Sequence, residues 1–224
     1  MLFRSDTGVG KTLVASALLH AAARRGLRSL GLKPLASGSA RAADGRLLNE
    51  DALSLQAAAS ITLPYEAVNA ISLEPAIAPH LAAEEAGVQL SAEALAGHCR
   101  RQLAHGHDLL LVEGAGGWRV PLNATETFAD LARALGFPVI LVVGLRLGCV
   151  NHALLTAEAI AADGLRLAGW VGSQIDPDMA RLEQNLHAIE ARIEAPCIGV
   201  IRHRAGIGFG DAAQSLDLDR LLGA

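Results

Sequence analysis

Uninterrupted apolar runs alternate with amphipathic segments along this chain. The runs from Asp108 to Gly114 and from Phe137 to Gly144 are typical of strands buried on both faces of a sheet. Strands are expected over 28–34, 108–114, 137–144, 165–171 and 197–201, and helices over 13–23, 50–60, 92–105, 125–135, 151–163, 179–193 and 216–222. This alternation predicts βαβ units, and therefore an α/β fold in which a mostly parallel sheet carries helices on both faces.

Two segments show neither a continuous apolar run nor an amphipathic pattern. Residues 36–46 are rich in Ser, Gly, Ala and Arg, which predicts a flexible loop. Residues 64–79 contain three prolines and predict irregular structure with one short strand. Asn49 and Ser91 stand where a helix N-cap is expected.

Composition narrows the class of protein. A length of 224 residues predicts a single domain over 1–224, with a core of Ala, Leu, Val and Ile because aromatic residues make up only 3%. The net charge of −4 argues against nucleic acid as a partner. No apolar run is long enough for a secretory signal or a membrane span. Three widely spaced cysteines, Cys99, Cys149 and Cys197, predict buried thiols in a reducing cytoplasm.

The stretch from Ser5 to Thr12 resembles a phosphate-binding loop. Gly10, Lys11 and Thr12 open an apolar helix, so backbone N–H groups and the lysine can face phosphates, and the hydroxyl can face Mg²⁺. Ser5 stands where the full signature has its first glycine, so an ordinary glycine turn remains the alternative. Only Met1 to Arg4 precede the loop, so either the first strand is very short or the chain starts late.

Several polar residues follow the predicted strands. Lys33, Glu113 and Gly144 fall at strand ends, as the phosphate loop does, and ligands of parallel sheets bind at these ends. Glu113 opens a glycine-rich turn and can hold a metal ion, while Asp51 begins a helix. A solvated surface position is the alternative for Lys33 and Glu113, and a charge that favours the helix macrodipole is the alternative for Asp51. Structural roles are expected for His80, His152, Trp118 and Trp170.

Five segments in order resemble the dethiobiotin synthetase family. They are Asp6–Thr12, Gly31–Gly38, Asn49–Gln56, Val112–Trp118 and Val143–His152, and the resemblance runs from about residue 5 to about residue 172. It implies a single-domain P-loop fold, a cytoplasmic homodimer, and an ATP- and Mg²⁺-dependent ligase. The family joins 7,8-diaminononanoate and CO₂ into a cyclic urea through a carbamate and a phosphorylated carbamate.

The resemblance also implies roles for residues. Lys33, Lys11 and Thr7 would be catalytic, and Thr12, Asp51 and Glu113 would surround Mg²⁺. The ATP site would comprise Gly8, Val9, Gly10, Lys11, Thr12, Leu13, Asp51, Glu113, Gly114, Ala115, Gly116, Ser173 and Gln174. The substrate would meet Ser37 and Thr7, and its carboxylate would meet Leu147, Gly148, Cys149, Val150 and Asn151 of the neighbouring subunit.

This sequence departs from the family at three places. Arg4 replaces a loop glycine, Ser173 replaces an asparagine that reads adenine, and the adenine loop is rewritten as Gly199–His203. An arginine forced into a left-handed conformation would cost about 1–2 kcal/mol. Two alternatives stay open. One is a P-loop partner or regulatory protein that catalyses nothing. The other is the amidoligase half of cobalamin-pathway enzymes, although 224 residues leave no room for its glutaminase domain.

Overall fold

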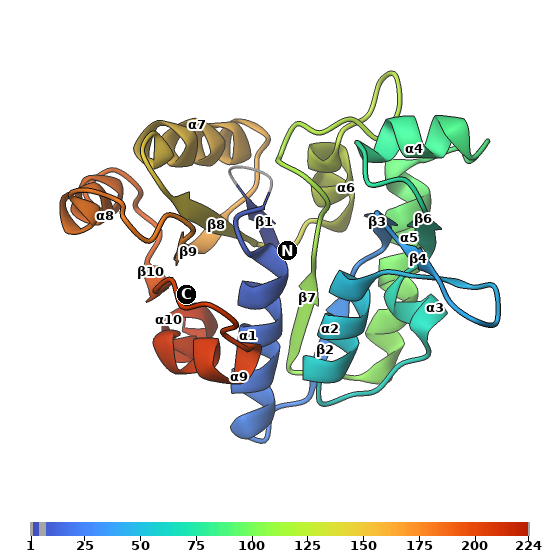
Figure 1. Ribbon diagram of the computed structural model, residues 1–224, viewed down its shortest axis with the longest axis horizontal. Helices are drawn as coiled ribbons and strands as arrows, with labels where there is room; N and C mark the ends of the chain where they lie inside the picture. The colour runs from blue at the N-terminus through green and yellow to red at the C-terminus, as the bar shows by residue number, and fades with distance from the viewer. Residues whose placement is uncertain (1, 5–7, 224) are drawn as a thin grey trace.

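The computed structural model describes the main chain of residues 2–4 and all atoms of residues 8–223 (Figure 1). Its largest sheet is parallel, with strand order β1-β8-β9-β10, and a second parallel sheet pairs β2 with β7. The strands are β1 (Leu2–Arg4), β2 (Ser29–Leu32), β7 (Leu109–Val112), β8 (Val139–Leu145), β9 (Leu167–Gln174) and β10 (Cys197–Ile201). The expected parallel strand pairing is therefore confirmed.

The longer helices occupy the intervals between these strands. They are α1 (Lys11–Arg24), α2 (Glu50–Ala58), α5 (Ala92–Gln102), α6 (Phe128–Leu135), α7 (Cys149–Ala162) and α8 (Leu182–Glu190). Shorter elements are α3 (Tyr65–Val68), α4 (Pro79–Glu85), α9 (Phe209–Ala212), α10 (Leu218–Leu222), and the 3-10 turns η1 (Leu103–His105) and η2 (Ala213–Ser215). In Figure 1, α1 stands between α2 and α9 and contacts both.

The alternation of side chains along β8 explains why helices cover both faces. Ile140 and Val142 are buried in one core cluster with residues of α1. Leu141 and Val143 are buried in another, with residues of α7 and α8. Successive residues of a strand point to opposite faces, so an entirely apolar strand requires a cover on each. Figure 1 shows α1 and α7 lying apart, with β8 between them.

The prediction of a flexible loop over 36–46 is wrong. Leu35–Ser37 forms β3, which pairs in parallel with β6 (Ile71–Leu73). A small antiparallel hairpin follows, made of β4 (Ala40–Arg41) and β5 (Leu47–Leu48). Gly45, with a φ of 84°, takes the left-handed conformation in its turn.

Other boundaries also differ from the sequence-based expectations. Residues 64–79 hold α3 and β6, and Pro79 begins α4, at a position where a proline sacrifices no helical hydrogen bond. Strand β9 extends to Gln174, three residues beyond the prediction. Helix α8 is shorter than the predicted 179–193, and α9 was not anticipated.

Two further expectations concern Arg4 and the cysteines. Arg4 lies in β1 opposite Val142. Among the described residues Arg181 is the non-glycine residue with positive φ, so the condition for left-handed strain at Arg4 is not met. Cys99 and Cys149 are buried, whereas Cys197 is half-buried, and all three are free thiols. Burial raises the pKa of the Cys99 thiol to about 12. None of the described helices combines the length and apolarity that crossing a bilayer requires.

Candidate active site

The phosphate loop turns on two glycines before α1. Gly8 and Gly10 have φ angles of 74° and 81°, which other residues adopt only with strain. Between them, the side chain of Val9 is completely buried. A Cβ atom added to Gly144 of β8 would lie 2.4 Å from Val9 Cγ1, so the loop can approach this strand because Gly144 has no side chain. Lys11 then begins α1.

Five side chains from separate parts of the sequence meet near the end of β7. Lys33 Nζ lies 2.6 Å from Glu113 Oε1 and 3.0 Å from Asp51 Oδ2. Lys11 Nζ lies 3.4 Å from Glu113 Oε1, and the Thr12 hydroxyl donates to the same oxygen at 3.0 Å. The structure thus brings together these five residues, which the sequence had placed at strand ends and helix starts.

Burial makes this pairing necessary. The side chains of Lys11 and Lys33 are each 3% exposed and that of Glu113 is 0% exposed. A buried charge without a partner would be strongly destabilising, and here each of these three charges has an opposite one within ion-pair distance. Lys33 also donates to the carbonyl oxygen of Gly114 at 3.4 Å.

The pKa values of two members shift so that both keep their charge near neutral pH. Burial would lower the pKa of Lys33, but the carboxylates of Glu113 and Asp51 outweigh it and raise that pKa above 10.5. Burial would raise the pKa of Asp51. The charge of Lys33 and hydrogen bonds from Thr12 and Lys33 reverse this, and bring the pKa below 3.8. Lys33 is therefore a cation and a hydrogen-bond donor.

A cavity of about 630 Å³ opens beside these charges. Its size suits a small-molecule ligand. Part of its lining is polar and comes from the cluster, with Ser37 added; another part is apolar, from Ala76–Pro79 and Val120. Among the described residues, the lining comprises Gly8, Gly10, Lys11, Thr12, Lys33, Ser37, Asp51, Ala76, Ile77, Ala78, Pro79, Ala115, Gly116 and Val120.

Three residues of the charged cluster have the chemistry of a magnesium site. Thr12, Asp51 and Glu113 offer oxygen atoms alone, which Mg²⁺ prefers. Glu113 Oε2 is buried and has no hydrogen-bond partner among the described residues, so it is available to a cation. Nowhere in residues 8–223 do three or more His, Cys, Asp or Glu side chains gather as a metal site, which leaves two carboxylates and one hydroxyl as the donors.

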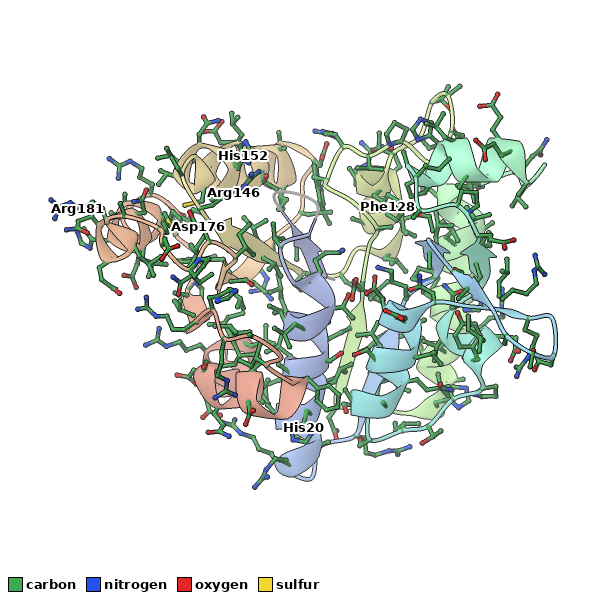
Figure 2. All side chains as sticks on the ribbon, in the orientation of Figure 1. His20, Phe128, Arg146, His152, Asp176 and Arg181 are labelled. Atoms are coloured by element: carbon green, nitrogen blue, oxygen red, sulfur yellow. The ribbon has the colours of Figure 1, made fainter. Side chains whose placement is uncertain are left out.

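The segment 147–151 lies at the start of α7. Gly148 is the N-cap with a φ of 93°, and Cys149 begins the helix, two residues before the predicted start. Leu147 is 91% exposed, whereas Cys149 is 2% exposed and faces the core. Figure 2 labels Arg146 just before this segment and His152 on α7 itself. The segment does not line the cavity of its own chain.

Ser173 and Gln174 lie at the end of β9. Ser173 is buried, and its Oγ would be 3.0 Å from a Cβ atom on Gly10, so it adjoins the phosphate loop. The Gln174 side chain donates to the carbonyl oxygens of residues 176–177, and its Oε1 accepts from the His203 N–H at 3.2 Å. Gln174 therefore joins β9 to the segment after β10.

Sequence reasoning missed part of the site, and one predicted residue cannot be placed. Thr7 lies outside the described residues. The apolar part of the lining from Ala76 to Pro79 was not anticipated, because three prolines in 64–79 indicated only irregular structure. Leu13, assigned to ATP, is half-buried and packs against the core cluster around α1. Trp118 and Trp170 are buried, as expected of packing residues.

Solved structures of low sequence identity share this fold. A chain of the MinC:MinD cell division protein complex of Aquifex aeolicus matches with a TM-score of 0.58 and 16% identity, covering 100% of this chain and 95% of its own. The ParA family ATPase from Chlorobium tepidum matches with a TM-score of 0.54 and 13% identity, covering 99% and 94%. Fold and phosphate loop together define a P-loop α/β protein.

Closer relatives define the family. The AAA domain family matches residues 1–208. ATP-dependent dethiobiotin synthetase BioD of Pseudomonas paraeruginosa is 55% identical over 96% of this chain and 93% of its own length. The protein of the same name from Cellvibrio japonicus is 56% identical over 98% and 96%. The chain belongs to the ATP-dependent dethiobiotin synthetase family.

Proposed function

We propose that this chain uses ATP to close 7,8-diaminononanoate and CO₂ into dethiobiotin, in the biosynthesis of biotin. The observation that carries this proposal is the position of the Lys33 ammonium. It lies in the cavity wall between Asp51 and Glu113, beside Lys11 and Thr12 of the phosphate loop. A cation next to a triphosphate site can stabilise a second anion. The carbamate formed in this reaction is such an anion.

The reaction divides into three steps. An uncharged amine of the substrate attacks CO₂ and loses a proton, which forms a carbamate. A carbamate oxygen attacks the γ-phosphorus of ATP, and ADP leaves with the electrons of the broken P–O bond. The second amine attacks the carbonyl carbon of this mixed anhydride, the C–O bond to phosphate breaks, and the ring closes as inorganic phosphate departs.

The side chains contribute position and charge to these steps. Lys11 lies where it can hold the transferred phosphoryl group, and Lys33 where it can bind the carbamate and its phosphorylated form. Because Lys33 stays protonated, it does not compete with the substrate amine for CO₂. Ser37, on the cavity wall, is placed to meet the urea-forming end of the substrate.

Magnesium belongs to the same proposal. Thr12, Asp51 and Glu113 would hold it, and the unpartnered Glu113 Oε2 supports this assignment. Mg²⁺ supplies charge neutralisation at the β- and γ-phosphate oxygens when it is bound. Lys33 would keep its position while Asp51 and Glu113, its two carboxylate partners, bind Mg²⁺.

We propose further that the chain works as a cytoplasmic homodimer. The first turn of α7 has N–H groups that favour a carboxylate, and we assign it to the substrate carboxylate of the neighbouring subunit. Leu147, just before this helix, and Leu155, within it, support an interface here, because they are 91% and 56% exposed. The adenine base would lie beyond Ser173, near the segment after β10 that Gln174 contacts.

The test is phosphate release from Mg²⁺-ATP, measured together with mass spectrometry for the cyclic urea. Release that requires both 7,8-diaminononanoate and bicarbonate, with dethiobiotin as the product, is the expected result. Omission of either compound is the matched control. Phosphate release without urea, or urea formation without ATP, would contradict the proposal. No release with any nucleotide would favour the alternative of a P-loop protein that catalyses nothing.

A further inference from the structure

A network of buried and half-buried polar side chains lies next to the main chain of Lys33 and outside the cavity lining. It consists of Asn49, Tyr65, Asn69 and Ser72, and is called the Tyr65 network below. These residues come from the N-cap of α2, from α3, from the residue after α3, and from β6. Asn49 and Asn69 are 5% and 4% exposed.

One end of the Tyr65 network holds the main chain of Lys33. The Lys33 N–H donates to the carbonyl oxygen of Val68 at 2.9 Å, and Asn69 Nδ2 donates to the carbonyl oxygen of Lys33 at 2.5 Å. The Ser72 hydroxyl donates to Asn69 Oδ1, which fixes the orientation of this amide. Both polar backbone groups of Lys33 are therefore held by two consecutive residues.

The other end holds the helix that carries Asp51. Asn49 Oδ1 accepts from the Asp51 N–H at 3.1 Å, and Asn49 Nδ2 donates to the carbonyl oxygen of Ser37 at 3.3 Å. The Asn49 N–H in turn donates to the Tyr65 hydroxyl at 2.7 Å.

The Tyr65 hydroxyl joins these two ends. It lies 3.1 Å from Ser72 Oγ and 3.3 Å from Asn69 Oδ1 while it accepts from Asn49. A single hydroxyl therefore connects the support of Lys33 with the support of Asp51, and both residues also meet directly through Lys33 Nζ.

We propose that Tyr65 and Asn69 are positioning residues, which set the place of the Lys33 ammonium relative to the reacting carbamate oxygens. The proposal rests on the function proposed above. The Lys33 ammonium is aimed by its two carboxylate partners, and the Tyr65 network fixes the backbone from which Lys33 extends and the helix from which Asp51 extends. A small misplacement of such a group slows a reaction strongly, because catalysis depends on near-attack geometry.

The test uses the fact that the chain contains two lysines, Lys11 and Lys33. Protein labelled with ¹³C at the lysine ε-carbon therefore gives two lysine side-chain signals in an NMR spectrum. In Tyr65→Phe, which removes only the hydroxyl, we expect the Lys33 signal to move and the Lys11 signal to stay. We also expect kcat for urea formation to fall about tenfold, with KM for ATP changed by less than about twofold.

A matched control removes a hydrogen bond elsewhere. Ser91 caps α5 by accepting from the Ala94 N–H at 3.4 Å, and it is not part of the Tyr65 network. Ser91→Ala should leave both lysine signals and kcat unchanged, although it weakens a helix end. If Tyr65→Phe does not fold, Ser72→Ala provides the same test, since it releases the amide of Asn69.

Two results would overturn the proposal. The first is an unmoved Lys33 signal with kcat within about twofold of the original in the folded variants tested. The second is a moved signal without any loss of kcat, because the place of Lys33 would then not matter to the reaction. Failure of the proposed function itself would look different. The unsubstituted chain would form no urea, while the lysine signals would still report whether Tyr65 holds Lys33.

Discussion

Lysine is confined to the site in this chain. Of its 19 Lys and Arg residues, 17 are arginines, and the two lysines lie 2.6 Å and 3.4 Å from the same Glu113 oxygen. An ammonium is a compact point charge with three donors, whereas a guanidinium is a planar fork. Lys33 uses its donors on Asp51, Glu113 and the carbonyl of Gly114, three directions that a planar group cannot match.

This geometry predicts that charge alone is insufficient at position 33. Lys33→Arg should lower kcat for urea formation about 100-fold, because the larger planar cation cannot occupy the same buried position and reach the carbamate. The assay of phosphate release and cyclic-urea formation measures this rate. Arg46→Lys is the matched control: Arg46 is 55% exposed and pairs with Asp44 and Glu66 at the surface, so its rate should change by less than about twofold. A Lys33→Arg enzyme with more than half the original rate would refute the argument.

At the scale of elements, a contact between the loop after Glu113 and the end of α7 holds part of the cavity wall. The Trp118 indole Nε1 donates to Asp163 Oδ2 at 2.6 Å, and Arg119 pairs with the same carboxylate at 2.9 Å. Asp163 is the C-cap of α7, where a negative charge does not favour the helix. Asp163 instead stabilises the loop, because it accepts a hydrogen bond from the buried indole N–H of Trp118.

Asp163→Ala should therefore lower the free energy of unfolding by about 1–3 kcal/mol, the usual cost of leaving a buried donor unpaired. Urea denaturation measures this, with an unchanged m-value if the folded state stays compact. Asp178→Ala is the control, since Asp178 is exposed, and its effect should stay within about 0.5 kcal/mol. Equal losses in the two variants would mean that the Trp118 contact contributes nothing.

How far the elements could be predicted depends on burial. The strands at 108–114 and 137–144 were predicted because both faces are buried, which makes the apolar run continuous. The hairpin of β4 and β5 was missed because each strand has two residues and β4 is exposed, so no alternation develops. Helix α4 was missed because its proline, Pro79, indicated a break, although it lies in the first turn.

The candidate site could likewise be predicted only in part. The meeting of Lys33 and Glu113 with the phosphate loop was predictable, since carboxyl ends of parallel strands share one edge of a sheet. The Tyr65 network and the apolar lining from Ala76 to Pro79 were not. They depend on contacts between segments whose sequences carry no periodic pattern, and only the folded chain brings these segments together.

At the scale of the whole molecule, the charged cluster links the four-stranded sheet with the sheet of β2 and β7. Lys11 and Thr12 follow β1 of the larger sheet, whereas Lys33 and Glu113 directly follow the strands β2 and β7 of the smaller one. The two sheets are joined by the ion pair between Lys11 and Glu113 and by the hydrogen bond that the Thr12 hydroxyl donates to Glu113. The stability of this connection should therefore depend on pH and on nucleotide.

The pH dependence has a definite sign. The pKa of Asp51 is lowered below 3.8, so its contribution to stability is present above pH 3.8 and is lost as pH falls through the folded-state value. The pKa of Lys33 is raised above 10.5, so its contribution is present below pH 10.5 and is lost as pH rises through its folded-state value. Urea denaturation of Asp51→Asn against the unsubstituted chain tests the acid limb. The difference should be below about 1 kcal/mol at neutral pH, because Asp51 is 44% exposed, and should vanish in strong acid. A difference that grows in acid would contradict the assigned pKa shift.

Nucleotide should strengthen the connection between the sheets, because a ligand that binds only the folded state stabilises it by mass action. At a concentration 100 times Kd the gain is about 2.7 kcal/mol, or about 5–10 °C in Tm for a chain of this size. Differential scanning fluorimetry should show this shift with Mg²⁺-ATP and a smaller one with ATP and a chelator, since Glu113 and Asp51 then face the phosphates without a cation. Lys11→Ala should lose most of the shift, whereas Arg46→Lys should keep it. An undiminished shift in Lys11→Ala would place nucleotide away from the phosphate loop, for example at the cavity of about 310 Å³ lined by Arg202, His203 and Arg204.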